Sequence, residues 1–151
     1  MSENLSELPD EPVYAMPIKI YFYDTDAGGV VHNVAYLRMV ETARSELAEK
    51  MGWTLHEMQM PDGNGCPVVA RTEIDYIRPA RLGDDLKIEA RIAAMEKVRF
   101  YIDFEITRPA DQTLISKCRQ KMVTVNLRSM RPVPLRQDWL EKWPHLVVKK
   151  G

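Results

Sequence analysis

The stretch YDTDAGGVVHN, residues 23–33, places two carboxylates, a glycine pair, a histidine and an asparagine between two different hydrophobic patterns. Before it, Ile18, Ile20 and Phe22 alternate with lysine and tyrosine, which predicts a half-buried strand. After it, apolar residues recur every three or four positions over residues 34–51, which predicts an amphipathic helix of about five turns. The stretch therefore predicts a turn that leads from a strand into a long helix.

Turn and cap residues suggest where these two elements begin and end. We expect Pro17 to open the strand, and Gly28 and Gly29 allow a tight turn. Asn33 is a good N-cap residue because its side chain can accept a hydrogen bond from the first free helix amides. A carboxylate at the strand end would then face a helix N-terminus, whose free amides and partial positive charge can hold an oxyanion.

The rest of the chain reads mainly as strands. Period-2 alternation predicts four further strands, over residues 68–77, 86–94, 98–107 and 113–127. The turn signal PDGNG at residues 61–65 precedes them, and Trp139, Leu140 and Trp143 predict a short helix near the end of the chain. Since the connections between the four strands are short, we expect an antiparallel meander.

These elements predict an α+β fold. Each strand has one apolar face that must be covered, and the only long amphipathic element is the helix. A curved antiparallel sheet of about five long strands wrapped around one long central helix is the compact solution. We expect residues 13–151 to form a single domain after a disordered lead-in over residues 1–12.

Composition excludes several classes of protein. With 45% hydrophobic and 28% charged residues, the chain is typical of a globular protein, and its net charge of −1 argues against nucleic-acid or membrane-surface binding. No apolar run approaches the ~18 residues needed for membrane insertion. Residues 1–97 carry 10 Lys/Arg against 17 Asp/Glu and residues 98–151 carry 11 against 5, giving −7 and +6. This asymmetry indicates either two differently solvated faces or a basic rim for a phosphorylated ligand.

Cysteine usage and the absence of some common motifs narrow the class further. Cys66 and Cys118 are far apart and form no C-x-x-C motif, and the N-terminus lacks the apolar region of a signal peptide. We therefore expect a reducing, cytoplasmic setting. No His/Cys/Asp cluster has metal-ligand spacing and no Gly-rich phosphate loop is present, so we expect neither a metal nor a cofactor.

Two motifs resemble one family. Y-D-T-D-A-G-G-V-V at residues 23–31 with Tyr36 on the helix, and Tyr76 followed by P-A-R-L-G-D at residues 79–84, resemble the hotdog-fold acyl-CoA thioesterases of the 4-hydroxybenzoyl-CoA thioesterase family. The branch encoded beside the Tol–Pal genes looks especially similar. The match covers residues 17–127 in order and spacing. The resemblance implies a hotdog fold, a short-chain or aromatic acyl-CoA substrate, and a homodimer or homotetramer.

The resemblance also assigns catalytic roles. Asp26 aligns with the family's carboxylate, which attacks the thioester carbonyl or activates water. The amide of Asn33 lies where the family polarises that carbonyl with the helix N-terminus, and His32 could orient water or the leaving group. The family often has His at the position of Asn33, so this chain departs from the pattern there.

Further residues are expected to bind the substrate. Glu41 lies where the hydroxybenzoyl-CoA enzymes place an acid against the substrate hydroxyl. The basic side chains of Arg71, Arg99, Lys117, Arg119 and Lys121 could hold the phosphates of coenzyme A. The full set of expected substrate contacts is Tyr23, Gly29, Tyr36, Glu41, Val69 and Arg71.

Other interpretations of the same residues remain open. Asp24 and Asp26 could be plain turn residues, whereas a calcium loop is excluded because its twelfth position is Ala35 rather than Glu. His32 could be only a helix-start residue, and Glu41 only a solvated acid. The substrate could instead be an acyl carrier protein thioester or a naphthoyl-CoA, and a non-catalytic scaffold that binds acyl-CoA is the alternative of another class.

Overall fold

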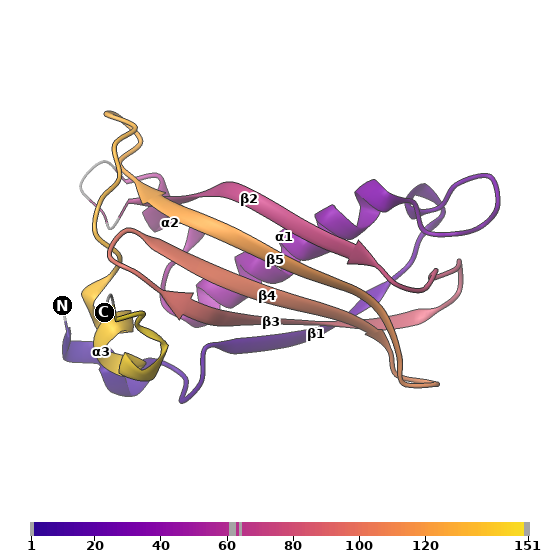
Figure 1. The fold of residues 1–151 in the computed structure, drawn as a ribbon, viewed down its shortest axis with the longest axis horizontal. Coiled ribbons are helices and arrows are strands. Elements are labelled where there is room, and N and C mark those ends of the chain that lie inside the picture. The colour runs from indigo at the N-terminus through magenta and orange to yellow at the C-terminus, as the bar shows by residue number, and fades with distance from the viewer. Residues whose placement is uncertain (1, 61–62, 64, 150–151) are drawn as a thin grey trace.

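A computed structural model describes residues 2–60, 63 and 65–149 (Figure 1). The strands, all paired antiparallel in one sheet of order β1-β3-β4-β5-β2, are β1 (Val13–Lys19), β2 (Cys66–Tyr76), β3 (Asp85–Met95), β4 (Arg99–Arg108) and β5 (Thr113–Val125). The α-helices are α1 (Asn33–Lys50), α2 (Leu55–Met58) and α3 (Gln137–Lys142). Short 3-10 helices are η1 (Ser2–Glu7), η2 (Phe22–Asp24) and η3 (Pro144–Leu146).

The sheet packs one face against α1, which confirms the predicted α+β arrangement of a five-stranded antiparallel sheet around one long helix (Figure 1). One stripe of α1 is buried, formed by Ala35, Tyr36, Met39, Val40, Ala43 and Leu47. The inner faces of β3 and β4 supply alternating buried side chains, namely Leu86, Ile88, Ala90 and Ile92, and Phe100, Ile102, Phe104 and Ile106. The core therefore follows from the two periodicities in the sequence.

The first strand differs from the prediction at both ends. β1 begins at Val13, and Pro17 lies inside it, opposite Lys87 of β3. Since β1 is an edge strand with only one neighbour, a residue without an N–H is tolerated there. The last residues of the predicted strand form η2 instead, and the side chains of Phe22 and Tyr23 are exposed.

The predicted four-stranded meander is wrong for β2. Only β3, β4 and β5 follow one another in space, and β2 pairs with the far side of β5, with Thr72 opposite Gln120. The connection 77–84 therefore crosses the end of the sheet. It is bonded to the loop before α1, because Val31 N–H donates to the Ala80 carbonyl (2.8 Å) and Leu82 N–H to the Gly29 carbonyl (3.0 Å). Connection length alone did not reveal this crossing.

The two ends of the chain meet near the C-terminal half of α1 (Figure 1). Leu8 is buried, and Trp143 Nε1 donates to the Asp10 carbonyl (2.9 Å). The short helix predicted from the tryptophans is confirmed as α3. η1 contacts α3, far along the chain, and the disordered lead-in expected for residues 1–12 stays a prediction. The predicted turn at residues 61–65 lies largely outside the described residues.

Phe104, 1% exposed on the inner face of β4, offers a test of this packing. We expect Phe104→Ala to lower the free energy of unfolding by about 3–5 kcal/mol, because it removes a buried ring and leaves a cavity. Leu127→Ala, at a side chain 47% exposed, should change it by about 0.5 kcal/mol or less. Urea unfolding measures both variants, and equal effects would contradict the described core.

Candidate functional site

Asp24 anchors the loop between β1 and α1. It is 4% exposed, and its carboxylate pairs with Arg38 of α1 and accepts the Tyr21 N–H at 2.9 Å. Its carbonyl accepts the His32 N–H at 2.9 Å. A buried carboxylate with these partners is satisfied at the loop and at the helix. Asp24 therefore fixes the loop against α1 rather than offering a free reactive group.

Asp26 forms the tight turn of the same loop. Its N–H donates to the Val30 carbonyl (2.9 Å), and its Oδ1 accepts the N–H groups of Gly28 (2.9 Å) and Val30 (3.4 Å). Gly29, at φ 74°, adopts the left-handed conformation that glycine tolerates best. The Asp26 side chain is exposed, and within the described residues its Oδ2 accepts no hydrogen bond. One carboxylate oxygen thus holds the turn and the other is available for chemistry.

His32, rather than Asn33, is the N-cap of α1. Its Nδ1 accepts the Ala35 N–H at 3.1 Å, and its Nε2 lies 3.2 Å from the Tyr23 carbonyl, to which it can donate. Both ring nitrogens are therefore engaged by the backbone. The predicted cap was one residue off, because histidine and asparagine can both accept at this position.

Asn33 becomes the first residue of α1 and is exposed. In the part of the chain that the structure describes, its backbone N–H has no acceptor. First-turn amides of a helix are normally free, and they carry the positive end of the helix dipole. The Asn33 amide can therefore donate to a ligand oxygen.

A cavity of about 330 Å³, called here the helix-start cavity, opens beside Asn33. Tyr36 and Tyr76 form its aromatic walls, with ring centroids 5.6 Å apart. The Tyr76 hydroxyl donates to the Asn33 carbonyl (3.4 Å), and the Tyr36 hydroxyl accepts the Ala80 N–H (3.3 Å). Burial raises the pKa of Tyr36, so its phenol is neutral near pH 7. The cavity is lined by Val30, Val31, Asn33, Tyr36, Tyr76, Ile77, Arg78 and Pro79.

The structure brings only some of the predicted site residues together. Asn33 and Tyr36 line the helix-start cavity, and the turn with Asp26 and Gly29 adjoins it through Val30. The other expected contacts lie elsewhere: Tyr23 beside Arg38, Glu41 at a second cavity further along α1, and Val69 and Arg71 on the exposed edge strand β2.

Several lining residues were missed as site residues, including Ile77, Arg78 and Pro79. All three belong to the connection that crosses the end of the sheet. Of the three, only Pro79 belongs to the second motif, P-A-R-L-G-D, and only the crossing shows that this motif lies against the loop of residues 24–31.

The basic residues considered for phosphate binding lie on the outer face of the sheet, and three of them have carboxylate partners. Arg119 contacts Asp103 at 2.6 Å, Arg71 contacts Glu73 at 2.6 Å, and Lys117 lies 3.9 Å from Glu105. Arg71, Arg119 and Lys121 share one shallow hollow there. Their role toward coenzyme A stays a prediction.

Other kinds of reactive group are weakly represented. Burial raises the pKa of the Cys118 thiol to about 11, so this thiol is protonated near pH 7 and is a poor nucleophile. Among the described residues, no group of three or more His, Cys, Asp or Glu side chains is placed to hold a metal ion. No helix in the described ranges is long and apolar enough to cross a membrane.

The sequence and the fold are similar to those of several known proteins. Residues 20–143 match the model of the thioesterase-like superfamily. The acyl-CoA thioesterase YbgC of Haemophilus influenzae is 30% identical over 137 residues, which cover 88% of this chain and 96% of that protein. The 1,4-dihydroxy-2-naphthoyl-CoA hydrolase of Synechococcus elongatus is 30% identical, over 81% of this chain and 90% of its own.

Among solved structures, the 1,4-dihydroxy-2-naphthoyl-CoA thioesterase Slr0204 from Synechocystis superposes with a TM-score of 0.78. It is 25% identical in sequence, and the superposition covers 89% of this chain and 97% of that one. The similarity therefore extends over nearly the whole sheet and helix.

The cap role of His32 can be tested by stability. We expect His32→Ala to lower the free energy of unfolding by about 1 kcal/mol, because Ala35 loses the acceptor of its N–H. His32→Ser should keep most of the stability, since serine is a good N-cap residue. Urea unfolding compares the two variants, and equal destabilisation would contradict the cap assignment.

Proposed function

The chain belongs to the thioesterase-like superfamily, and we propose that it is a thioester hydrolase that cleaves a short-chain or aromatic acyl-CoA to the free acid and CoA. The observation that carries the proposal is the placement of two groups by one loop. Among the residues that the structure describes, one Asp26 carboxylate oxygen accepts no hydrogen bond, and seven residues later the Asn33 N–H at the start of α1 has no acceptor.

In the proposed mechanism, the Asn33 N–H polarises the thioester carbonyl, and the Asp26 carboxylate attacks it or activates a water molecule. The thioester carbonyl oxygen accepts the Asn33 N–H, and the helix dipole stabilises the negative charge that develops on it. The Asp26 carboxylate attacks the carbonyl carbon, the C–S bond breaks, and CoA leaves as the thiolate. Water then hydrolyses the resulting mixed anhydride and restores Asp26. In an alternative mechanism, the Asp26 carboxylate takes a proton from a water molecule, and this water attacks the thioester carbonyl directly.

The neighbouring residues hold these groups in place. His32 has both ring nitrogens bonded to backbone groups, so we assign it the role of fixing the helix start rather than a proton transfer. Asp24 and Arg38 bind the loop to the helix. One donor of this kind at an oxyanion can contribute about 10²–10³ in rate, provided that its position is fixed.

We further propose that the working unit is a homo-oligomer, a dimer or a tetramer. The expected substrate contacts lie apart in one chain, and Glu41, Val69 and Arg71 are exposed. β2 is an edge strand with most of its residues exposed, and long open edges are usually covered.

Two free cysteines support a reducing, cytoplasmic setting for the protein. We also propose that residues 13–151 act as one domain.

A naphthoyl-CoA is the second candidate substrate. Tyr36 and Tyr76 give the helix-start cavity two aromatic walls, which suit a flat aromatic acyl group. Relatives named 1,4-dihydroxy-2-naphthoyl-CoA hydrolase are as similar in sequence as those named acyl-CoA thioesterase. Rates measured on both short-chain and aromatic acyl-CoA thioesters distinguish the two candidates.

Substitution of Asp26 tests the mechanism. We expect Asp26→Asn to lower kcat on the best acyl-CoA by about 10²–10⁴, because the reacting oxygen loses its charge. The melting temperature should change little, since an amide oxygen can still accept the turn N–H groups. Release of free thiol, followed with a panel of short-chain, long-chain and aromatic acyl-CoA thioesters, measures the rate.

Asp75→Asn, at an exposed acid on β2, is the matched control and should keep full activity. Full activity of Asp26→Asn would overturn the assignment. A wild-type protein that binds CoA thioesters but turns none over would favour the non-catalytic scaffold, and turnover of acyl carrier protein thioesters alone would change the substrate.

A further inference from the structure

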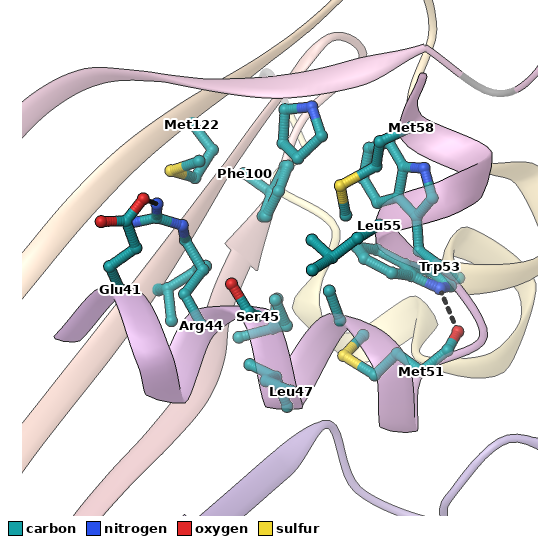
Figure 2. Close-up of a pocket in the computed structure, with 15 residues that line it drawn as sticks. Glu41, Arg44, Ser45, Leu47, Met51, Trp53, Leu55, Met58, Phe100 and Met122 are labelled. Carbon is teal, nitrogen blue, oxygen red and sulfur yellow. Dashed lines mark hydrogen bonds and ion pairs between the residues drawn. The ribbon is translucent and has the colours of Figure 1, made fainter. Parts of the chain in front are cut away.

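A second cavity, called here the inner cavity, lies between α1 and the sheet further along the helix (Figure 2). Its volume is about 190 Å³. Glu41 and Arg44 lie together at one end of it, and Met51, Trp53 and Met58 lie at the other (Figure 2). An apolar cavity of about 150 Å³ in another protein stays dry and binds benzene, so the inner cavity has room for a ring or a short alkyl chain.

A polar bridge crosses the space between helix and sheet at the Arg44 end. One Arg44 guanidinium nitrogen donates to Gln120 Oε1 of β5 at 2.6 Å, and Gln120 Nε2 donates to Thr72 Oγ1 of β2 at 3.2 Å. The Gln120 side chain is buried, at 5% exposure, and the Arg44 side chain is only 19% exposed. The bridge therefore joins α1, β5 and β2, and its β2 end at Thr72 is exposed.

This bridge stands between the two cavities on each of the three elements. On β5, Ser116 pairs with Tyr76 of the helix-start cavity, Gln120 pairs with Thr72, and Met122 lines the inner cavity. All three of these β5 side chains are buried. From Ser116 to Met122, β5 therefore passes the helix-start cavity first, then the bridge, and then the inner cavity.

The same order holds along α1 and β2. On α1, Tyr36 lines the helix-start cavity, Arg44 forms the bridge, and Ala48 lines the inner cavity. On β2, Thr72 lies between Tyr76 and Pro67, which lines the inner cavity. From the Asn33 amide, Arg44 lies about 16 Å along the helix axis, at ~1.5 Å per residue.

Resting on the thioester hydrolysis proposed above, we propose that Arg44, held by Gln120, is the residue that excludes long acyl chains. An acyl group whose carbonyl lies at the Asn33 amide, and whose chain runs along α1 toward the inner cavity, meets the Arg44 guanidinium before it reaches that cavity. Alkyl groups that pack against a charged, hydrogen-bonded side chain must strip its remaining water or break its bonds, which is unfavourable. The inner cavity is the apolar space that lies beyond the Arg44 guanidinium as seen from Asn33.

The test measures kcat/KM for a series of saturated acyl-CoA thioesters of increasing length. We take the ratio of kcat/KM for a chain long enough to reach Arg44 to kcat/KM for the chain that wild type prefers. Arg44→Ala should raise this ratio about tenfold or more, because additional methylene groups gain an apolar pocket. Arg44→Lys keeps a cation at this position and should leave the ratio near the wild-type value.

Filling the inner cavity provides the matched control. Ala48→Met places a longer apolar side chain in the cavity and should not change the wild-type ratio, because no substrate reaches that space. Combined with Arg44→Ala, it should cancel most of the gain. Arg44→Met removes the charge and keeps the stem, so it replaces Arg44→Ala should the latter fail to fold.

The outcomes separate this inference from the proposed function. Wild-type protein without turnover on any CoA thioester contradicts the proposed function itself. Wild-type turnover with an unchanged ratio in folded Arg44→Ala and Arg44→Met overturns only the role of Arg44. A lowered wild-type ratio in Ala48→Met alone would show that the chain already enters the inner cavity, which also overturns the inference.

Discussion

The burial of one stripe of α1 against the inner face of the sheet is the constraint on which the other features depend. The stripe from Ala35 to Leu47 is covered by the alternating inner side chains of β3 and β4. Because the helix must lie along the sheet, its N-terminus reaches the end where the connection 77–84 crosses. The free amide of Asn33, the turn of Asp26 and the aromatic walls of Tyr36 and Tyr76 meet there as a result.

The sequence predicted the parts of the fold that depend on local periodicity. The long helix and the strands after it were found within a few residues, because buried and exposed side chains alternate at period 2 or recur at 3.6. Features set by distant partners were not predicted. Pro17 lies inside β1 because β1 is an edge strand, and β2 pairs with β5 because the connection crosses the sheet end. Neither fact is encoded in a local pattern.

The candidate site shows the same division. The resemblance supplied Asp26 and the helix start, and the motif gave their separation along the chain. It did not reveal that Asp24 is buried against Arg38, or that both ring nitrogens of His32 are bonded to the backbone. These roles depend on which side chain forms a hydrogen bond with each available backbone or side-chain group. The polar bridge from Arg44 to Gln120 joins residues far apart in sequence, so it was visible only in three dimensions.

All three tryptophans of the chain lie in one aromatic cluster at the far end of the helix. Trp53 and Trp139 have ring centroids 5.3 Å apart, and Trp139 and Trp143 are 6.4 Å apart. The intrinsic ultraviolet emission of the protein therefore reports on that end of the molecule, where both chain termini pack. A molecule that binds beside Asn33 would leave the tryptophan emission nearly unchanged. A molecule that reached past Arg44 would contact the indole rings and change the wavelength and intensity of their emission.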